Sequence, residues 1–282
     1  MLSYNDLLHY HDEGYVLIER AVPEGMLMPL RAAGQRITER TRRGDWPHKR
    51  AIGDEDIWGR SDLLRPEAGE PVFSEYMASA VVLETVAALL GVSSGQDTPL
   101  QLELVNMLVN PVHRDFEIGW HRDLVPTTLP PEEEYARLLE IRHGVQWNTA
   151  LYDDVCLRIV PGSHIRASTE QERDIVQHRS FDPMPNEIVV RLEAGQGVYY
   201  NANLLHRVVY AKDRRRETIH ACIGTVDGAP LRGDLYTWLS WMCAPEFEET
   251  LPSCLRPLYE NFVRMAKMMD QRARQPGQQP RH

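Results

Sequence analysis

Short segments with the composition of β-strands fill the chain from Leu100 to Thr225, and they constrain the fold more than any other feature. Most are rich in β-branched and aromatic residues and are bounded by Gly, Pro, Asn or Asp. Helices do not alternate with them as in a parallel α/β protein, so the pattern predicts an antiparallel sandwich or barrel. The segments are LQLELVNMLVN, FEIGWHRDLV, VQWNTALY, LRIVPGSH, NEIVVRLE, GVYYNANLLHRVVY and TIHACIGTV.

Helical patterns precede this β-rich region. Ser3, followed three residues later by Asp6, has the spacing of a capping box, which predicts a helix that Gly14 ends. Ser74 is the predicted N-cap of another helix, whose apolar residues recur at helical spacing until Gly91. Between these two helices we expect, in order, a strand over 15–22, a helix over 23–43 and a loop-rich stretch over 44–69.

Two further helices are expected within and after the strands. Residues 130–144 begin with Pro and end with Gly, which predicts one helical insertion among the strands. Residues 255–272 carry apolar side chains at helical spacing. Because no repeat and no linker divides the chain, we expect one domain over 1–270, with a helical N-terminal portion (1–95), a β core (100–226) and a disordered tail (271–282).

The composition argues against some kinds of partner. The chain has 282 residues and a formal net charge of −10, whereas nucleic acids and anionic membranes favour basic surfaces. No apolar run approaches the roughly 18 residues of a membrane helix, and the acidic first residues lack the apolar centre of a signal peptide. The four cysteines are spaced unlike a zinc site or a disulfide framework. We therefore expect a cytoplasmic protein with free thiols and with no nucleic-acid or membrane partner.

A His-x-Asp tripeptide occurs twice, eight residues apart. The first, His113 to Asp115, follows a proline and is typical of a turn between strands. The second, His121 to Asp123, lies inside a strand-like run, where the period of two sends both side chains to one face of the sheet. A neighbouring imidazole and carboxylate on one rigid element could bind a metal. His206, late in a strand-like run 85 residues downstream, is the candidate third ligand.

Two histidines and one carboxylate suit more than one metal. They form the facial triad of non-haem Fe(II) oxygenases, which leaves positions for a co-substrate and O2. Zinc hydrolases use the same set of ligands. The spacing favours iron and leaves zinc open.

Three segments in this order resemble the phytanoyl-CoA dioxygenase family of Fe(II)- and 2-oxoglutarate-dependent oxygenases. They are WHRD, QWNTALYDDVCLRIVPGSH and GVYYNANLLHRVVYAKDRRRETIH, with a looser likeness in HDEGYVLIERAV near the N-terminus. The resemblance implies a mainly β double-stranded β-helix, a cupin-like jelly roll, flanked by N-terminal and C-terminal helices. It implies iron held by His121, Asp123 and His206, since the family's His-x-Asp pair follows a tryptophan, as in GWHRD.

The resemblance also implies a site for the co-substrate 2-oxoglutarate. The family holds its far carboxylate with an arginine about ten residues after the distal histidine, where Arg216 stands. An arginine fork suits this task because it can bond both carboxylate oxygens at once. Arg215 is the alternative, and Arg216 is favoured because it adjoins the strand ETIHACIG. Asn148 matches a position that often lines the co-substrate pocket, although a polar residue satisfied within the sheet is an equal interpretation.

Three lesser expectations concern neighbouring residues. In the family the histidine of PGSH, here His164, supports a turn and binds no metal. His220 and Trp147 are expected to be packing residues. The insertion over 130–144 follows the proposed metal pair directly, so it is well placed to cover the site.

Together these residues predict an oxygenase that uses O2 to hydroxylate a small organic molecule, with release of succinate and CO2. A place in secondary metabolism is an analogy with the family. Related halogenases lack the carboxylate, so Asp123 favours hydroxylation, while desaturation, ring closure and epimerisation stay open. Two other classes also stay open: a metal-dependent hydrolase or isomerase on a cupin-like barrel, and a catalytically silent small-molecule binder.

Overall fold

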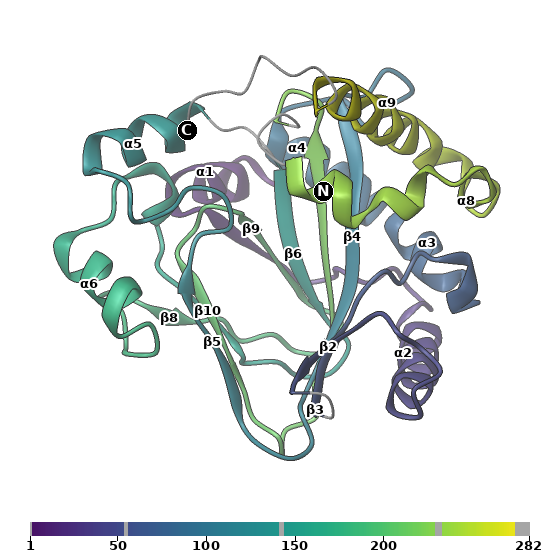
Figure 1. Ribbon diagram of the computed structural model, residues 1–282, viewed down its shortest axis with the longest axis horizontal. Coiled ribbons are helices and arrows are strands. Elements are labelled where there is room, and N and C mark those ends of the chain that lie inside the picture. The colour runs from purple at the N-terminus through teal and green to yellow at the C-terminus, as the bar shows by residue number, and fades with distance from the viewer. Residues whose placement is uncertain (1, 54–55, 141–143, 229–232, 274–282) are drawn as a thin grey trace.

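Two antiparallel sheets form a jelly roll in the computed structural model, which describes residues 2–53, 56–140, 144–228 and 233–273 (Figure 1). The larger sheet contains, in spatial order, β1 (Tyr15–Ile18), β9 (Gly197–Asn201), β6 (Gly144–Ala150), β11 (Glu217–Thr225), β4 (Leu100–Val109), β3 (Asp56–Arg60) and β2 (Lys49–Ile52). The smaller sheet contains β5 (Phe116–His121), β10 (His206–Tyr210), β7 (Leu157–Ile159) and β8 (Ile188–Val189). The predicted mainly β jelly roll is confirmed.

Alternation along the strands gives the large sheet two different faces. In β6 the Trp147 side chain is buried in the core that the sheet shares with the helices. Its neighbours Gln146 and Asn148 point the other way, into the space between the two sheets, because successive strand residues face opposite sides. Tyr199 and Tyr200 of β9 divide in the same manner between the helix-side core and the inter-sheet core. The sheet therefore has an apolar outer face and a mixed inner face.

Helices cover the outer face of the large sheet. Figure 1 shows α2, α3 and α9 on that side and α5 and α6 beside the small sheet, and α9 packs against β4. The α-helices are α1 (Tyr4–Glu13), α2 (Leu27–Arg42), α3 (Val72–Met77), α4 (Ala80–Leu90), α5 (Pro131–Glu140), α6 (Glu170–His178), α7 (Gly233–Trp238), α8 (Pro245–Glu249) and α9 (Arg256–Ala273). Short 3-10 turns lie at Pro66–Ala68, Ser163–Ile165, Ser240–Cys243 and Ser253–Leu255.

The first helix begins and ends where the sequence predicts. The Ser3 hydroxyl accepts from the backbone N–H of Asp6, and the Asp6 carboxylate accepts from the backbone N–H of Ser3, so the capping box is confirmed. Gly14 ends the helix with φ +82°, in the left-handed region that favours glycine. The turn that Gly14 makes leads directly into β1, an edge strand of the large sheet.

The second predicted N-cap is wrong. Ser74 lies inside α3, and the chain bends after it, so that one expected helix is divided into α3 and α4. The N-cap of α4 is Ser79, whose side chain accepts from the backbone N–H of Val82. Gly91 ends α4 as predicted, with φ +65°.

Other departures concern elements that the sequence conceals. The loop-rich stretch over 44–69 contains β2 and β3, which extend the large sheet beyond β4. A second helical insertion, α6, follows the PGSH turn. The segment GVYYNANLLHRVVY is two strands rather than one, because β9 pairs in the large sheet and β10 in the small one. Within the expected tail, 271–273 belong to α9, and 274–282 lie outside the described residues.

Among the helices that the structure describes, none combines the length and the apolar character needed to cross a membrane.

Candidate metal centre

The two histidines of the candidate centre face each other on neighbouring strands. His121 is the last residue of β5, and His206 is the first residue of β10. The antiparallel register pairs these two positions directly, and their ring centroids are 4.2 Å apart. The expectation that His206 lies late in a strand is therefore wrong, but the pairing brings it to His121.

Asp123 lies beyond the end of β5, so the expectation that the tripeptide lies inside a strand is also wrong. The chain leaves the sheet after His121, and the backbone N–H of Asp123 donates to the carbonyl of Ala202, 3.0 Å away. The carboxylate nevertheless reaches both rings, with Oδ1 3.6 Å from His121 Nε2 and Oδ2 3.9 Å from His206 Nε2. One possible ligand atom from each residue lies within 4.8 Å of the others, which is close enough for a single ion to bind all three.

Both imidazoles are oriented by backbone carbonyls. The Nδ1 atom of His121 is 2.7 Å from the Gly119 oxygen, and that of His206 is 2.8 Å from the Leu204 oxygen. Because a carbonyl can only accept, each Nδ1 carries the proton and each Nε2 keeps its lone pair for a metal. The donor set thus fits a divalent cation.

The charges of the site suit a cation as well. Burial lowers the pKa of His206 to about 4, and His121 acts in the same direction against the opposing effect of Asp123. Burial acts to raise the pKa of Asp123, but the two histidines and a hydrogen bond from Gln146 outweigh it, so that the pKa lies below its usual value. At neutral pH the site therefore offers a neutral His206 imidazole and a carboxylate anion, the forms that bind metals.

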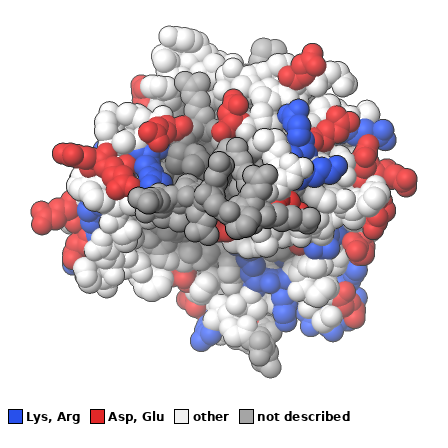
Figure 2. Space-filling model, turned by 45° about the horizontal axis from the view of Figure 1, so that its top comes forward, with Lys and Arg blue, Asp and Glu red and all other residues white. Residues whose placement is uncertain are grey.

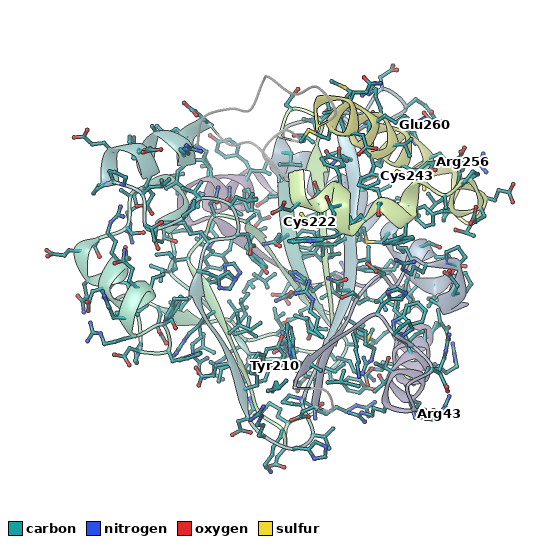
Figure 3. All side chains as sticks on the ribbon, in the orientation of Figure 1. Arg43, Tyr210, Cys222, Cys243, Arg256 and Glu260 are labelled. Carbon is teal, nitrogen blue, oxygen red and sulfur yellow. The ribbon has the colours of Figure 1, made fainter. Side chains whose placement is uncertain are left out.

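The three residues open into a cavity of about 100 Å³ between the two sheets. Asn148 lines it, and its Oδ1 is 2.9 Å from Nδ1 of His220, so the expectation that His220 only packs in the core is incomplete. Tyr210 of β10 also lines the cavity, and its ring centroid is 5.7 Å from that of Trp58 in β3 (Figure 3 labels Tyr210). The remaining lining residues are Arg50, Trp58, Leu108, Ile118, Gln146, Tyr200 and Val208.

Arg216 lies behind the cavity wall rather than in it. Its guanidinium carbon is 4.6 Å from the centroid of the Tyr210 ring, and its Nε donates to Asp154 at 2.9 Å. Burial acts to lower the pKa of Arg216, but Asp154 outweighs it, so the pKa is raised and the side chain stays charged. Its Nη1 and Nη2 atoms are buried and have no hydrogen-bond partner among the described residues, which leaves the outer edge of the fork available for a carboxylate. Arg215 points outward, with about half of its side chain exposed.

Arg122, between the two proposed ligands in the sequence, points away from the cavity and anchors them. Its side chain is fully buried, pairs with Glu134 of α5 and donates to the carbonyls of Ser163 and Asn203. The sequence indicated no role for this residue. The insertion is thus connected to the site through Arg122, although the residues of α5 do not line the cavity.

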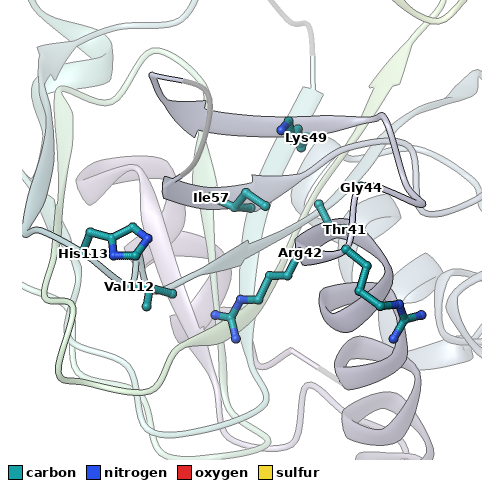
Figure 4. A pocket seen from close by; sticks show the side chains of 8 residues that line it. Thr41, Arg42, Gly44, Lys49, Ile57, Val112 and His113 are labelled. Carbon is teal, nitrogen blue, oxygen red and sulfur yellow. The ribbon is translucent and has the colours of Figure 1, made fainter.

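Two further histidines that the sequence singles out, His113 and His164, lie away from the cavity. His113 lines a separate hollow of about 440 Å³ beside α2 and β2 (Figure 4). Its backbone N–H and those of its two neighbours donate to Asp56, which fixes the first tripeptide as a turn. His164 contacts the carbonyl of His11 in α1 through Nε2, at 3.0 Å. Neither histidine belongs to a group of three possible metal ligands among the described residues.

Sequence similarity identifies the family. Residues 10–208 match the phytanoyl-CoA dioxygenase (PhyH) family, which is more than half of the chain. The chain belongs to the phytanoyl-CoA dioxygenase family. The matched region includes His121, Asp123 and His206 and ends before Arg216. No curated protein matches this member of the family significantly.

Solved structures share the fold of this PhyH-family chain. EctD from S. alaskensis, solved with 2-oxoglutarate and 5-hydroxyectoine, is 15% identical with a TM-score of 0.61, over 80% of this chain and 77% of EctD. AviO1 from Streptomyces viridochromogenes Tue57 is 18% identical with a TM-score of 0.56, over 78% and 93%. The alpha-ketoglutarate-dependent epimerase SnoN from nogalamycin biosynthesis is 16% identical with a TM-score of 0.54, over 79% and 80%.

Proposed function

We propose that this chain is an Fe(II)- and 2-oxoglutarate-dependent dioxygenase that hydroxylates a small organic molecule. The observation that carries the proposal is the convergence of two Nε2 lone pairs and one carboxylate at the mouth of an inter-sheet cavity. His121, Asp123 and His206 would hold the iron. Bound there, iron together with 2-oxoglutarate and O2 supplies the oxidising power needed to break an unactivated C–H bond, with succinate and CO2 as co-products.

The residues around the triad keep it ready for the metal. Carbonyls fix the proton of each ring on Nδ1, and Gln146 donates to Oδ2 of Asp123, which helps to orient the carboxylate. His206 is buried, whereas about a third of the His121 and Asp123 side chains is exposed, so the ligands can be reached from solvent. The protein thus contributes the orientation of the ligands.

Arg216 is the residue we assign to the far carboxylate of 2-oxoglutarate. Two of its buried nitrogens have no hydrogen-bond partner within the described part of the chain, and a bidentate carboxylate would provide one for each. Tyr210 stands between Arg216 and the cavity, so the ring must turn or the co-substrate must pass its edge. Asn148 is assigned to the same pocket as a polar wall residue. Arg215 faces solvent, which supports the choice of Arg216.

Hydroxylation in secondary metabolism is the reaction we favour. Asp123 fills the position whose loss would leave room for a halide, and the EctD structure contains a hydroxylated compound, 5-hydroxyectoine. Structures named as an epimerase and as a carbocyclase, both from nogalamycin biosynthesis, have the same fold, so the triad alone does not select hydroxylation. We also propose a cytoplasmic protein, since the four cysteines are not spaced like a disulfide framework.

We further propose that residues 1–270 work as one jelly-roll domain. Helices from the two ends of the chain, α1 and α9, pack against strands of the same large sheet, β1 and β4. Separate domains would have separate cores, whereas these helices cover one face.

The test is metal binding and 2-oxoglutarate turnover by the purified chain under anaerobic loading with Fe(II). The wild type should bind one equivalent of iron and form succinate when O2 is admitted. His121→Ala and Asp123→Ala should lose both properties, because two ligands seldom hold the ion. His113→Ala is the matched control, since it removes the histidine of the other tripeptide and should leave both unchanged.

The rival functions predict different results. A zinc hydrolase or isomerase would retain zinc through purification and form no succinate from 2-oxoglutarate. A silent binder would bind neither metal. Loss of iron binding in His113→Ala would show that the wrong tripeptide has been assigned.

A further inference from the structure

A second hollow, of about 600 Å³, opens on the outer surface of the molecule and is lined by four arginines. Parts of the chain far apart in sequence meet there: α2, the segment after β6, the segment before β9 and the turn before β11. We name it the arginine hollow and define it by Arg31, Tyr152, Asp153, Val155, Arg191, Ala194, Arg214 and Arg215.

The charge of this hollow is opposite to that of the whole chain. Its lining has four arginines and one acid, whereas the chain has 41 acidic and 31 basic residues. Figure 2 shows both signs interspersed over one face of the molecule, the arrangement usual for a soluble surface. The acidic residue of the lining, Asp153, accepts a hydrogen bond from the backbone N–H of Ala194, so its carboxylate is already engaged with the backbone.

The arginines of the hollow are poorly compensated. No carboxylate among the described residues forms an ion pair with Arg31, Arg191 or Arg214, and Arg215 pairs with Glu217 through one nitrogen. Like charges held together repel one another, so such a cluster is unfavourable until an anion enters it. Nothing in the proposed reaction uses these four residues.

Two of the four are fixed in place by one aromatic ring. The guanidinium carbons of Arg31 and Arg215 lie 4.3 and 3.8 Å from the centroid of Tyr152. Arg31 also donates to the carbonyl of Leu151 at 2.7 Å. Stacking leaves the N–H edges of a guanidinium free for a ligand and reduces the entropy that is lost when it binds.

We infer that the arginine hollow is a binding site for a small oxyanion with two or more negative charges, of the phosphate or polycarboxylate class. Guanidinium groups recognise both classes through paired N–H donors. The arginine hollow adjoins the buried pair of Arg216 and Asp154. Five of its lining residues, at 152, 153, 155, 214 and 215, are sequence neighbours of that pair. It is a site separate from the inter-sheet cavity, with which it shares no lining residue.

The experiment is calorimetric titration of the full chain, without added metal, with inorganic pyrophosphate and separately with citrate. The variant is Arg191→Gln/Arg214→Gln, two exposed residues whose loss should leave the fold intact, as thermal denaturation will check. The matched control is Arg42→Gln/Arg43→Gln, which removes two arginines from the other hollow (Figure 4). The same titrations with His121→Ala show whether an anion binds at the proposed metal site.

The wild type should bind pyrophosphate, citrate or both saturably. Comparison of the two titrations distinguishes a phosphate site from a carboxylate site. The affinity should fall at least tenfold in Arg191→Gln/Arg214→Gln and less than about twofold in the control and in His121→Ala. Tyr152→Leu keeps every charge and should also weaken binding, because both stacked arginines lose their support. An absence of saturable binding, equal losses in variant and control, or loss in His121→Ala would each overturn the assignment.

Discussion

Replacing Glu134 with Gln tests whether the helical insertion holds the proposed metal ligands in place. Glu134 lies in the first turn of α5, and its side chain is fully buried. One carboxylate oxygen accepts from Arg122 at 3.2 Å and from the Ser168 hydroxyl at 2.7 Å. The other accepts from the Ser168 backbone N–H at 3.0 Å and from Arg173. Two arginines thus share one buried negative charge.

The expected loss of stability follows from those contacts. Glutamine has no charge and only one acceptor atom, so it cannot serve both arginines. Removing one partner of a buried ion pair costs about 3–5 kcal/mol, because the other charge stays buried without compensation. Arg122 keeps its hydrogen bonds to the carbonyls of Ser163 and Asn203, which soften the loss. We therefore expect a decrease of about 3 kcal/mol in the free energy of unfolding, at the lower end of that range.

Urea denaturation measures the stability, and Glu133→Gln is the matched control. Glu133 is the preceding residue of the same helix, is about half exposed and pairs with the exposed Arg137, so its loss should change stability by no more than about 0.5 kcal/mol. Arg122 is the residue between His121 and Asp123 in the sequence, and Glu134 holds its side chain in place. Glu134→Gln should therefore also weaken Fe(II) binding by about tenfold or more.

Two results would contradict this account. If Glu134→Gln is as stable as the control, the buried network does not support the fold. If stability falls while the iron affinity is unchanged, the insertion stabilises the fold without positioning the ligands.

The remaining predictions concern a buried pair and two glycines. Arg216→Gln should destabilise the protein by about 3 kcal/mol at pH 7, because Asp154 is left buried and charged. The pKa of Asp154 is lowered in the folded wild type because Arg216 and its hydrogen bonds outweigh the effect of burial, so its stabilising effect is present above the unfolded value of 3.8 and is lost as the pH falls. In the variant burial raises that pKa, so the stability gap measured by urea denaturation should narrow from pH 7 to pH 4. Gly14→Ala should cost about 2 kcal/mol or more, since φ is +82° and a Cβ would lie 2.5 Å from Nδ1 of His164. Gly91→Ala, with φ +65° and no atom within 4 Å of a Cβ, should cost only about 1 kcal/mol; equal losses would show that the contact with His164 is unimportant.

The sequence predicted the β core and the first helix because their signals are local. Ser3, Asp6 and Gly14 act within one helix, and their roles follow from spacing alone. The prediction that Ser74 is an N-cap was wrong because the choice between one helix and two depends on tertiary packing. Ser74 donates to the Pro71 carbonyl, and Ser79 instead provides the cap where the chain turns toward the sheet. Both serines have the same local preference.

The walls of the cavity could not be predicted in the same way. Arg50 and Trp58 belong to β2 and β3, which are short and polar enough to be taken for loop. They become strands because β3 pairs with β4, a contact between segments almost 50 residues apart. Arg122 was missed for a related reason, since its partner Glu134 lies in an insertion of high charge whose default interpretation is a solvated face.

The position of the candidate metal ligands shows what the tripeptide does and does not determine. His121 ends β5 and His206 begins β10, so the antiparallel pairing of two strand ends, rather than alternation along one strand, brings the rings together. The Asp123 carboxylate lies beside the two rings because the chain leaves the sheet after His121. The backbone N–H of Asp123 then donates to the carbonyl of Ala202, in the segment that leads into β10. A slip of one residue in this register would turn His206 to the opposite face and separate the ligands. The pairing of β5 with β10 therefore specifies the site, and the His-x-Asp spacing is useful only because it ends at that pair.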